Sequence, residues 1–338
     1  MPELIHTTIG AFLHAQADRC GQREALVSDS MRLSYAQMLE TTADYARRFL
    51  AAGIRKGSHV GVISNDRPET ILCFYALWRI GAIVIPVCTG FGKEEVSACV
   101  HSAGIEFFVI DHEFRGNLFP ELVKDLPVRE VLTLQEEPGY PYRCLYSLPV
   151  AEERLLTEAE ASVRDDDPDT ILFTSGSTGS AKPVLTTHFS RVNTMVAQAV
   201  GLEADENDRF CSVLPVFHCF SLTGTVLAAM AAGACLVFPA DRKTETILRT
   251  VERERCTILT AVPTLFSALL RRQAELHTDL SSLRTGMIGG SAYPPEFFRR
   301  ICDEREKNSR KLEEDTQAMA EKLTAETVEK CRRQRSEE

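Results

Sequence analysis

This sequence lacks the cysteine and histidine patterns that would fix a redox or metal chemistry. None of its 11 cysteines forms a C-x-x-C pair, and its 8 histidines do not cluster at the spacing of metal ligands. The number of cysteines is odd, and Cys73, Cys99 and Cys235 lie within apolar segments. That distribution is typical of reduced thiols in a cytosolic protein. We therefore expect a cytoplasmic location and no disulfide framework.

The chain also lacks a membrane signal and an excess of positive charge. It has no run of about 18 apolar residues, and its opening residues, MPELIHTTIGAFLHAQ, have no basic n-region of a signal peptide. The formal net charge is −10 and the pI is near 5.4, so the protein has no general attraction for nucleic acid or an anionic membrane. We expect no transmembrane segment and no nucleic-acid partner.

What the sequence does contain is a regular alternation of strand and helix patterns. Its 338 residues, 44% apolar and 25% charged, suit one large or two moderate globular domains. Residues 35–50 place apolar side chains on one helical face, with Ser34 as the N-cap and Gly53 just past the end. Further helices are predicted at 68–81, 94–104, 188–201, 221–233, 244–254 and 264–273, and strands at 59–64, 82–87, 106–110, 170–174, 210–215, 234–239 and 256–263. The alternation predicts an α/β fold of mostly parallel sheets covered by helices.

Two stretches depart from this alternation. Residues 135–169 are irregular, which predicts a surface excursion and a subdomain break. From about Ile301 the chain has no Gly, no Pro and no strand pattern, and its apolar residues are sparse. We therefore expect one domain over residues 1–300 and a charged helical tail over 301–338.

The stretch TSGSTGSAKPVLTTH, residues 174–188, has the chemistry that a phosphate-binding loop needs. It follows an apolar strand pattern and combines Gly176 and Gly179 with small hydroxyl residues and one lysine, Lys182. Glycine lets backbone N–H groups turn toward an anion, hydroxyls add donors, and lysine adds a positive charge. It is not a Walker A loop, because Lys182 lies three residues after Gly179 and is followed by Pro183. The alternative interpretation is a flexible Gly/Ser connector.

The stretch FTSGSTGSAKPVLTTH resembles the phosphate loop of the AMP-forming adenylating enzymes, which include acyl-CoA synthetases, firefly luciferase and the adenylation domains of peptide synthetases. The family pattern is [YF]-T-S-G-[TS]-T-G-x-P-K-G-V with a His shortly after. This sequence departs from it at Ala181 and at Pro183, where proline fixes φ and removes an N–H. The resemblance implies a catalytic role for Lys182 and an Mg²⁺ contact for Thr178. It also implies that the triphosphate of ATP is held by Thr174, Ser175, Gly176, Ser177, Thr178, Gly179 and Lys182.

Two later stretches resemble the same family in the same order. LPVFHCFSLTG, residues 214–224, is similar to its L-P-L-F-H-x-x-G element, which places His218 at the acyl pocket as a second catalytic residue. LRTGMIGGSAYPPEFF, residues 283–298, is similar to its L-R-x-x-x-x-G-G-A-P-L-P-x-E segment, which places Gly289, Gly290 and Ser291 in the pocket wall. Taken singly, a structural histidine and an ordinary strand-to-turn segment remain open alternatives.

The resemblance covers roughly residues 8–300 and implies the fold and reaction of that family. The fold would be the N-terminal domain of the adenylate-forming enzymes, with stacked, mostly parallel sheets. The reaction would be ATP-dependent activation of a carboxylic acid, here a fatty acid, through an acyl-adenylate, followed by transfer to CoA.

The later family motifs are not found after Phe298: an aromatic-Gly-x-[TS]-Glu segment, a T-G-D segment and a C-terminal catalytic lysine. We therefore expect a truncated family member with an exposed sheet edge that favours self-association, and its enzymatic activity stays an open question. The alternatives are an inactive relative that acts as a nucleotide-binding or scaffolding partner, and a partial gene product.

Overall fold

The computed structural model describes residues 4–174, 182–292, 294–297 and 299–303. They form two compact units, which divide between Ala240 and Asp241. The predicted helical tail falls mostly on residues 304–338, outside the described residues, and the predicted domain limits at 135–169 and 300 stay predictions.

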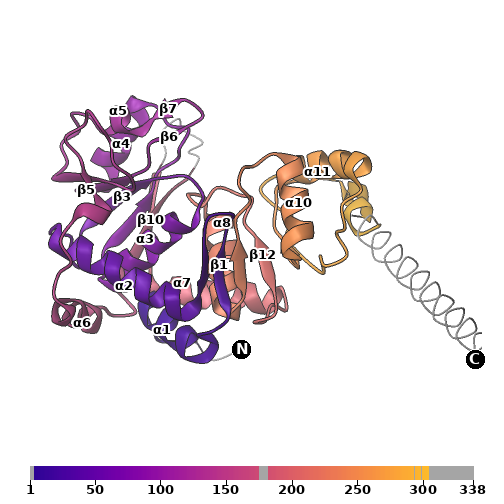
Figure 1. The fold of residues 1–338 in the computed structure, drawn as a ribbon, viewed down its shortest axis with the longest axis horizontal. Helices are drawn as coiled ribbons and strands as arrows, with labels where there is room; N and C mark the ends of the chain where they lie inside the picture. Colours follow the sequence, from indigo (N-terminus) through magenta and orange to yellow (C-terminus); the bar gives the residue numbers. More distant parts are fainter. Residues whose placement is uncertain (1–3, 175–181, 293, 298, 304–338) are drawn as a thin grey trace, which may run out of the picture. The chain divides into compact units, whose positions relative to one another are not determined.

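A seven-stranded sheet forms the centre of the first unit (Figure 1). Its neighbouring strands are parallel, except that the edge strand β11 runs antiparallel to β10. In spatial order the strands are β11 (Lys182–Thr187), β10 (Pro168–Thr174), β4 (Ile83–Pro86), β3 (His59–Ile63), β5 (Phe107–Ile110), β8 (Glu130–Thr133) and β9 (Arg143–Cys144).

The order of these strands places a switch point between β3 and β5. From β3 the chain passes to β4 on one side of β3, and then crosses to β5 on the other side of β3. The loops after β3 and β5 therefore lead away from each other. In doubly wound sheets, ligands bind at such a switch point, outside the carboxyl ends of the strands.

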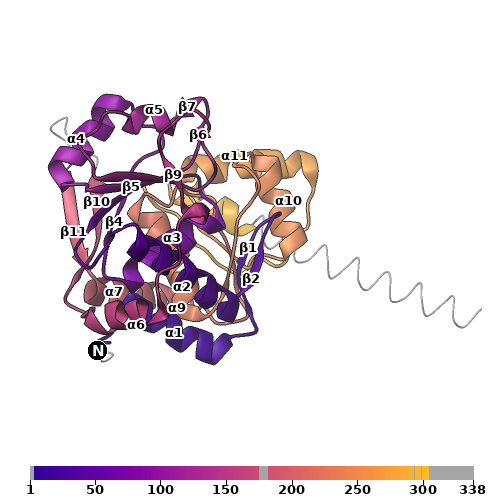
Figure 2. The same ribbon diagram turned by 60° about the vertical axis from the view of Figure 1, so that its left-hand side comes forward.

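Helices cover both faces of the seven-stranded sheet, as Figures 1 and 2 show. The α4 and α5 helices cover one face, where they pack into a buried apolar cluster with β5 side chains such as Phe108. The α3 helix packs against β4 on the other face and also contacts α1 and α2. The bounds are α1 (Ile9–Cys20), α2 (Tyr35–Ala51), α3 (Pro68–Arg79), α4 (Lys93–Ala103), α5 (Phe119–Val123), α6 (Glu153–Ser162) and α7 (His188–Gly201).

A smaller sheet of the first unit lies on the far side of α2, which contacts both β1 and β2. Its order within this unit is β12 (Arg209–Cys211), β13 (Cys235–Val237), β1 (Glu24–Val27) and β2 (Arg32–Ser34). Only β1 and β2 pair in antiparallel fashion. A hairpin of β6 (Glu113–Phe114) and β7 (Asn117–Leu118) and a 3-10 turn, η1 (Leu145–Ser147), complete the peripheral structure.

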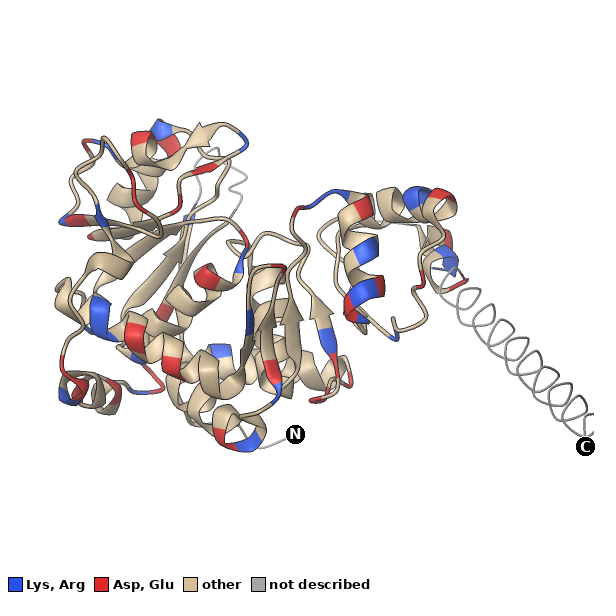
Figure 3. Cartoon of the chain, in the orientation of Figure 1, with Lys and Arg blue, Asp and Glu red and all other residues tan. Residues whose placement is uncertain are grey.

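The second unit, as far as it is described, consists of α10 (Thr244–Glu254), β14 (Ile258–Leu259) and α11 (Pro263–Leu276), followed by an extended segment. That segment pairs in parallel with the β14 region through Ile258–Thr285 and Ala261–Ile288. Basic and acidic residues are interspersed along the described elements of both units (Figure 3).

The predicted α/β fold with mostly parallel sheets and covering helices is confirmed. Helix α2 begins after Ser34, whose hydroxyl accepts from Gln37 N while the Gln37 side chain accepts from Ser34 N, a reciprocal capping box. One local prediction was wrong, because residues 182–187 form a strand rather than a loop. The helix predicted at 221–233 is confirmed, and it contains a six-residue π-helical segment, η2 (Leu222–Leu227), between α8 (Cys219–Ser221) and α9 (Ala228–Ala232).

Among the described residues, the cysteines are not joined in disulfides. Burial raises the pKa of Cys99 to about 11 and raises the pKa of Cys73 as well, so both thiols stay protonated at neutral pH. In the described part of the chain, no three His, Cys, Asp or Glu side chains come together as a possible metal site. None of the helices described is both long enough and apolar enough to cross a membrane.

Candidate active site

The two ends of the predicted phosphate loop face each other across a β-hairpin. Strands β10 and β11 pair with Thr174 opposite Lys182, and the Thr174 hydroxyl lies 3.4 Å from the Lys182 carbonyl oxygen, to which it donates. Both residues are exposed. The other predicted phosphate ligands, Ser175, Gly176, Ser177, Thr178 and Gly179, lie outside the described residues. The hairpin therefore returns Lys182 to the mouth of the loop that Thr174 opens.

A buried ion pair anchors the base of this hairpin. Asp169 on β10 is 0% exposed, and its Oδ2 accepts from Nε of Arg191 on α7 at 3.0 Å. The Thr186 hydroxyl on β11 donates to Asp169 Oδ1 at 2.7 Å and accepts from Arg191 Nη2 at 2.7 Å. Both strands and α7 thus share one hydrogen-bond network. The sequence alone does not reveal this network, although Asp169 beside the apolar TILF run is a possible signal.

His218 lies at the start of α8, in a turn closed by several hydrogen bonds. Its backbone N–H donates to the Pro215 carbonyl at 3.1 Å, and the Ser221 hydroxyl donates to the Leu214 carbonyl at 2.9 Å. The exposed imidazole accepts from Phe220 N through Nδ1 at 3.2 Å. A neutral ring with Nδ1 as acceptor carries its proton on Nε2. The turn therefore presents an N–H donor that could bind a carboxylate oxygen.

The π-helical segment after His218 is connected to the hairpin through Arg191. Arg191 Nη1 donates to the Thr223 hydroxyl at 2.9 Å, while its Nε contacts Asp169. Isolated π-helical turns occur frequently at functional sites. Arg191 thus brings together the base of the phosphate loop and the element that follows His218, two regions that the sequence analysis proposed separately.

Gly289, Gly290 and Ser291 follow the extended segment of the second unit. Gly290 has φ +89°, a left-handed conformation, and an added Cβ would lie 3.2 Å from Cγ1 of Val262. Gly290 and Ser291 are exposed, and Gly289 is half-buried. This geometry explains the glycine at 290 through backbone conformation. It fits both the predicted pocket wall and an ordinary turn.

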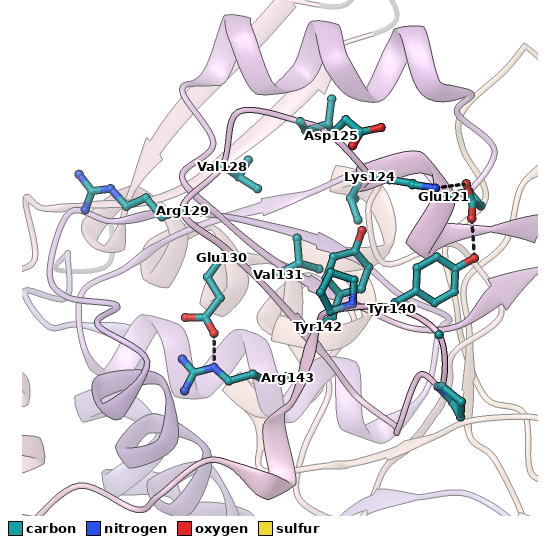
Figure 4. A pocket seen from close by; sticks show the side chains of 15 residues that line it. Glu121, Lys124, Asp125, Val128, Arg129, Glu130, Val131, Tyr140, Tyr142 and Arg143 are labelled. Carbon is teal, nitrogen blue, oxygen red and sulfur yellow. Dashed lines mark hydrogen bonds and ion pairs between the residues drawn. The ribbon is translucent and has the colours of Figure 1, made fainter.

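Two cavities in the described residues are formed by other side chains than those predicted for the site. One, of about 790 Å³, is open and polar and contains the stacked rings of Tyr140 and Tyr142 (Figure 4). Polar groups of this cavity interact with one another. The Tyr140 hydroxyl donates a hydrogen bond to Glu121 at 2.7 Å, and Arg143 forms an ion pair with Glu130. The other, of about 190 Å³, is an apolar cavity within the second unit, lined by side chains such as Leu248, Phe266 and Leu269. Neither cavity contains a sequence-predicted site residue.

The first residue of α7, His188, gives the first unit a specific response to pH. It is fully buried, Nδ1 accepts from Ile9 N at 3.3 Å, and Nε2 has no hydrogen-bond partner. Burial is the main cause that lowers the pKa of His188 below its ordinary value of 6.5. The unfolded chain therefore binds a proton that the folded chain does not bind. The neutral His188 ring makes its full contribution to the unfolding free energy above pH 6.5, and this contribution is lost as the pH falls below that value.

We expect a smaller loss of stability at low pH when this imidazole is replaced. The unfolding free energy of the parent protein and of His188→Gln should be measured by urea titration at about pH 7.5 and about pH 5.5. The decrease between these values should be smaller in the variant, whereas the exposed-site control His101→Gln should show the parent decrease. Equal decreases in the parent protein and His188→Gln would contradict the assignment.

Comparison with known proteins identifies the family of this chain. The AMP-binding enzyme family matches residues 13–308. The Bacillus subtilis (strain 168) protein YngI is 32% identical over 334 residues, covering 90% of this chain and 60% of that protein. Acyl-CoA ligase SID4 of Ajellomyces capsulatus is 30% identical over 319 residues, covering 90% of this chain and 54% of that protein. The chain spans about half the length of the curated relatives that it matches.

Solved structures show the same fold at lower sequence identity. The N-terminal domain of FACL13 from Mycobacterium tuberculosis aligns with a TM-score of 0.73 and 23% identity, covering 88% of this chain and 73% of that one. The anthranilate CoA ligase AuaEII aligns with a TM-score of 0.76 and 21% identity, covering 87% of this chain and 57% of that one. The resemblance identified from the three sequence motifs is thus confirmed, and the chain belongs to the AMP-binding enzyme family.

Proposed function

We propose that this chain binds ATP at the β10–β11 loop and a carboxylic acid beside His218, as part of an acyl-CoA synthetase reaction. In that reaction a carboxylate oxygen attacks the α-phosphorus of ATP and pyrophosphate leaves. The thiol of CoA then attacks the acyl carbon of the acyl-adenylate, and AMP leaves. A fatty acid is the proposed acid, because the LPVFHCF turn resembles that of fatty-acyl-CoA synthetases.

The observation that carries this proposal is the register of the hairpin. Pairing of Thr174 with Lys182 brings a hydroxyl residue and a lysine to the two ends of one glycine-containing loop. The ammonium group supplies a positive charge for phosphate, and loop N–H groups supply donors. Among the matched relatives, SID4 is named an acyl-CoA ligase and ACSF2 of Danio rerio a medium-chain acyl-CoA ligase, which supports acid activation and transfer to CoA.

The proposed reaction also implies Mg²⁺, which would accompany ATP. Mg²⁺ is usually bound by one or two carboxylates together with substrate phosphates. In the described part of the chain, no group of three or more His, Cys, Asp or Glu side chains could hold a metal ion, and Thr178, the Mg²⁺ contact that the resemblance implies, lies outside the described residues. We propose that Mg²⁺ enters together with ATP. It would offset phosphate charge, while Lys182 and the loop donors orient the triphosphate.

Replacement of Lys182 tests the nucleotide site directly. Lys182→Ala removes a charge-assisted contact to phosphate, so the Kd for ATP should rise about tenfold, equivalent to about 1.4 kcal/mol. Isothermal titration of the purified chain with ATP and Mg²⁺ measures this change. Lys93→Ala is the matched control, because Lys93 is an exposed lysine on α4. Equal ATP affinity in Lys182→Ala and the parent protein would exclude the proposed phosphate role.

A further inference from the structure

The loop between β3 and α3 is held by hydrogen bonds at the switch point of the sheet. Asn65 Nδ2 donates to Asp111 Oδ2 at 3.0 Å, and Arg67 Nη2 donates to Asp111 Oδ1 at 2.8 Å. Asp111 follows β5 and is only 3% exposed. The two residues that flank Asp66 are therefore both bonded to one buried carboxylate on the opposite side of the switch point. This arrangement fixes the position of Asp66.

Asp66 connects this loop to the His218 turn. Its Oδ1 accepts from the backbone N–H of Val216 at 2.6 Å, across 150 positions of sequence. Hydrogen bonds to a charged acceptor are roughly twice as strong as neutral ones. The backbone N–H of His218 donates to the Pro215 carbonyl and closes a turn. Val216 lies within this turn. A shift of Val216 would therefore move the turn that orients the imidazole.

We propose that Asp66 is a positioning residue, which fixes the turn at Val216 and so directs the His218 N–H donor toward the acid substrate. This inference rests on the proposed function of the His218 site. Asp111 accepts hydrogen bonds from Asn65 and Arg67, which hold the loop that contains Asp66. Asp66 in turn accepts from Val216 N and so holds the turn. Arg191 holds the other end of the element through Thr223. His218 is thereby held from both sides by long-range contacts.

The orientation of His218 can be tested without any ligand. Long-range ¹H–¹⁵N spectra of the histidine rings distinguish a protonated from an unprotonated nitrogen, and His218→Gln assigns the His218 signals. The parent protein should show one tautomer, with Nδ1 unprotonated and Nε2 protonated, at a pH where the ring is neutral. Asp66→Ala should give mixed tautomers and altered shifts for His218. Unchanged His218 signals in Asp66→Ala would overturn the inference.

Binding measurements separate positioning from a general loss of structure. The probes are ATP and 5′-O-(N-octanoylsulfamoyl)adenosine, a stable analogue of an acyl-adenylate. In Asp66→Ala the analogue should bind about tenfold more weakly, while ATP affinity changes less than about twofold. Asp66→Asn retains an acceptor oxygen and should recover most of the analogue affinity. The control Asp44→Ala, which removes only the Arg48 contact on α2, should match the parent protein.

The two possible failures have different signatures. Equal weakening of both ligands by Asp66→Ala, or weakening of neither, would overturn the positioning role. If the parent protein binds neither ATP nor the analogue, the proposed function fails. In that case the tautomer of His218 in Asp66→Ala still decides whether Asp66 orients the ring.

Discussion

Asp169→Ala should lower the unfolding free energy of the protein by about 3–5 kcal/mol, the cost of removing one partner of a buried ion pair. The carboxylate is 0% exposed and Arg191 is 5% exposed, so the variant leaves a guanidinium in the interior without its charge partner. Thr186 also loses its acceptor at 2.7 Å. Urea titration followed by circular dichroism measures the change. The base of the β10–β11 hairpin should exchange its amide hydrogens faster than in the parent protein.

A nearby aspartate provides the matched control. Asp165→Ala removes a contact to His6, whose side chain is 73% exposed, and should change stability by less than about 1 kcal/mol. The double variant Asp169→Ala/Arg191→Met removes both charges and should be more stable than the sum of the two single changes predicts. A loss below about 1 kcal/mol in Asp169→Ala would show that the pair does not anchor the hairpin.

Local sequence patterns were sufficient to predict most elements of this fold. Helix α2 is an example, because its capping residues, Ser34 and Gln37, and the apolar face that it buries lie within one short segment. The edge strand β11 was missed for a physical reason. Its sequence, KPVLTT, leaves Val184 and Leu185 exposed, so it does not show the alternation of a half-buried strand. Pairing with β10 determines its conformation.

The candidate site was predicted only where its residues belong to a local motif. Lys182 and His218 lie within recognisable segments, and the structure places Lys182 at the hairpin and His218 at the start of α8. Their roles in the site stay predictions. Asp66 and Arg191 act across long sequence separations, 150 residues from Asp66 to Val216 and 32 from Arg191 to Thr223. Spacing in a sequence does not reveal such pairs, because the strand order brings them together.

The extended segment before Gly289 depends on a glycine whose role is visible only in the structure. An added Cβ at Gly286 would lie 1.9 Å from the carbonyl oxygen of Leu259. Residues on either side of Gly286 bond to the β14 region, where Leu259 N donates to Thr285 O and Ala261 N donates to Met287 O. A backbone oxygen cannot move away as a flexible side chain could, so any side chain at 286 must separate the two segments.

Gly286→Ala should therefore destabilise the second unit by about 3 kcal/mol, at the upper end of the usual cost of overpacking. The segment that leads to Gly289, Gly290 and Ser291 would separate from β14, so hydrogen exchange at residues 258–261 and 285–288 should accelerate. Gly201→Ala is the matched control, because no atom lies within 4 Å of its added Cβ. On α7 that change should leave stability equal or slightly higher, since alanine favours helix. If Gly286→Ala unfolds at the same denaturant concentration as the parent protein and exchanges no faster in these segments, the close approach at Leu259 does not determine the position of the predicted pocket wall.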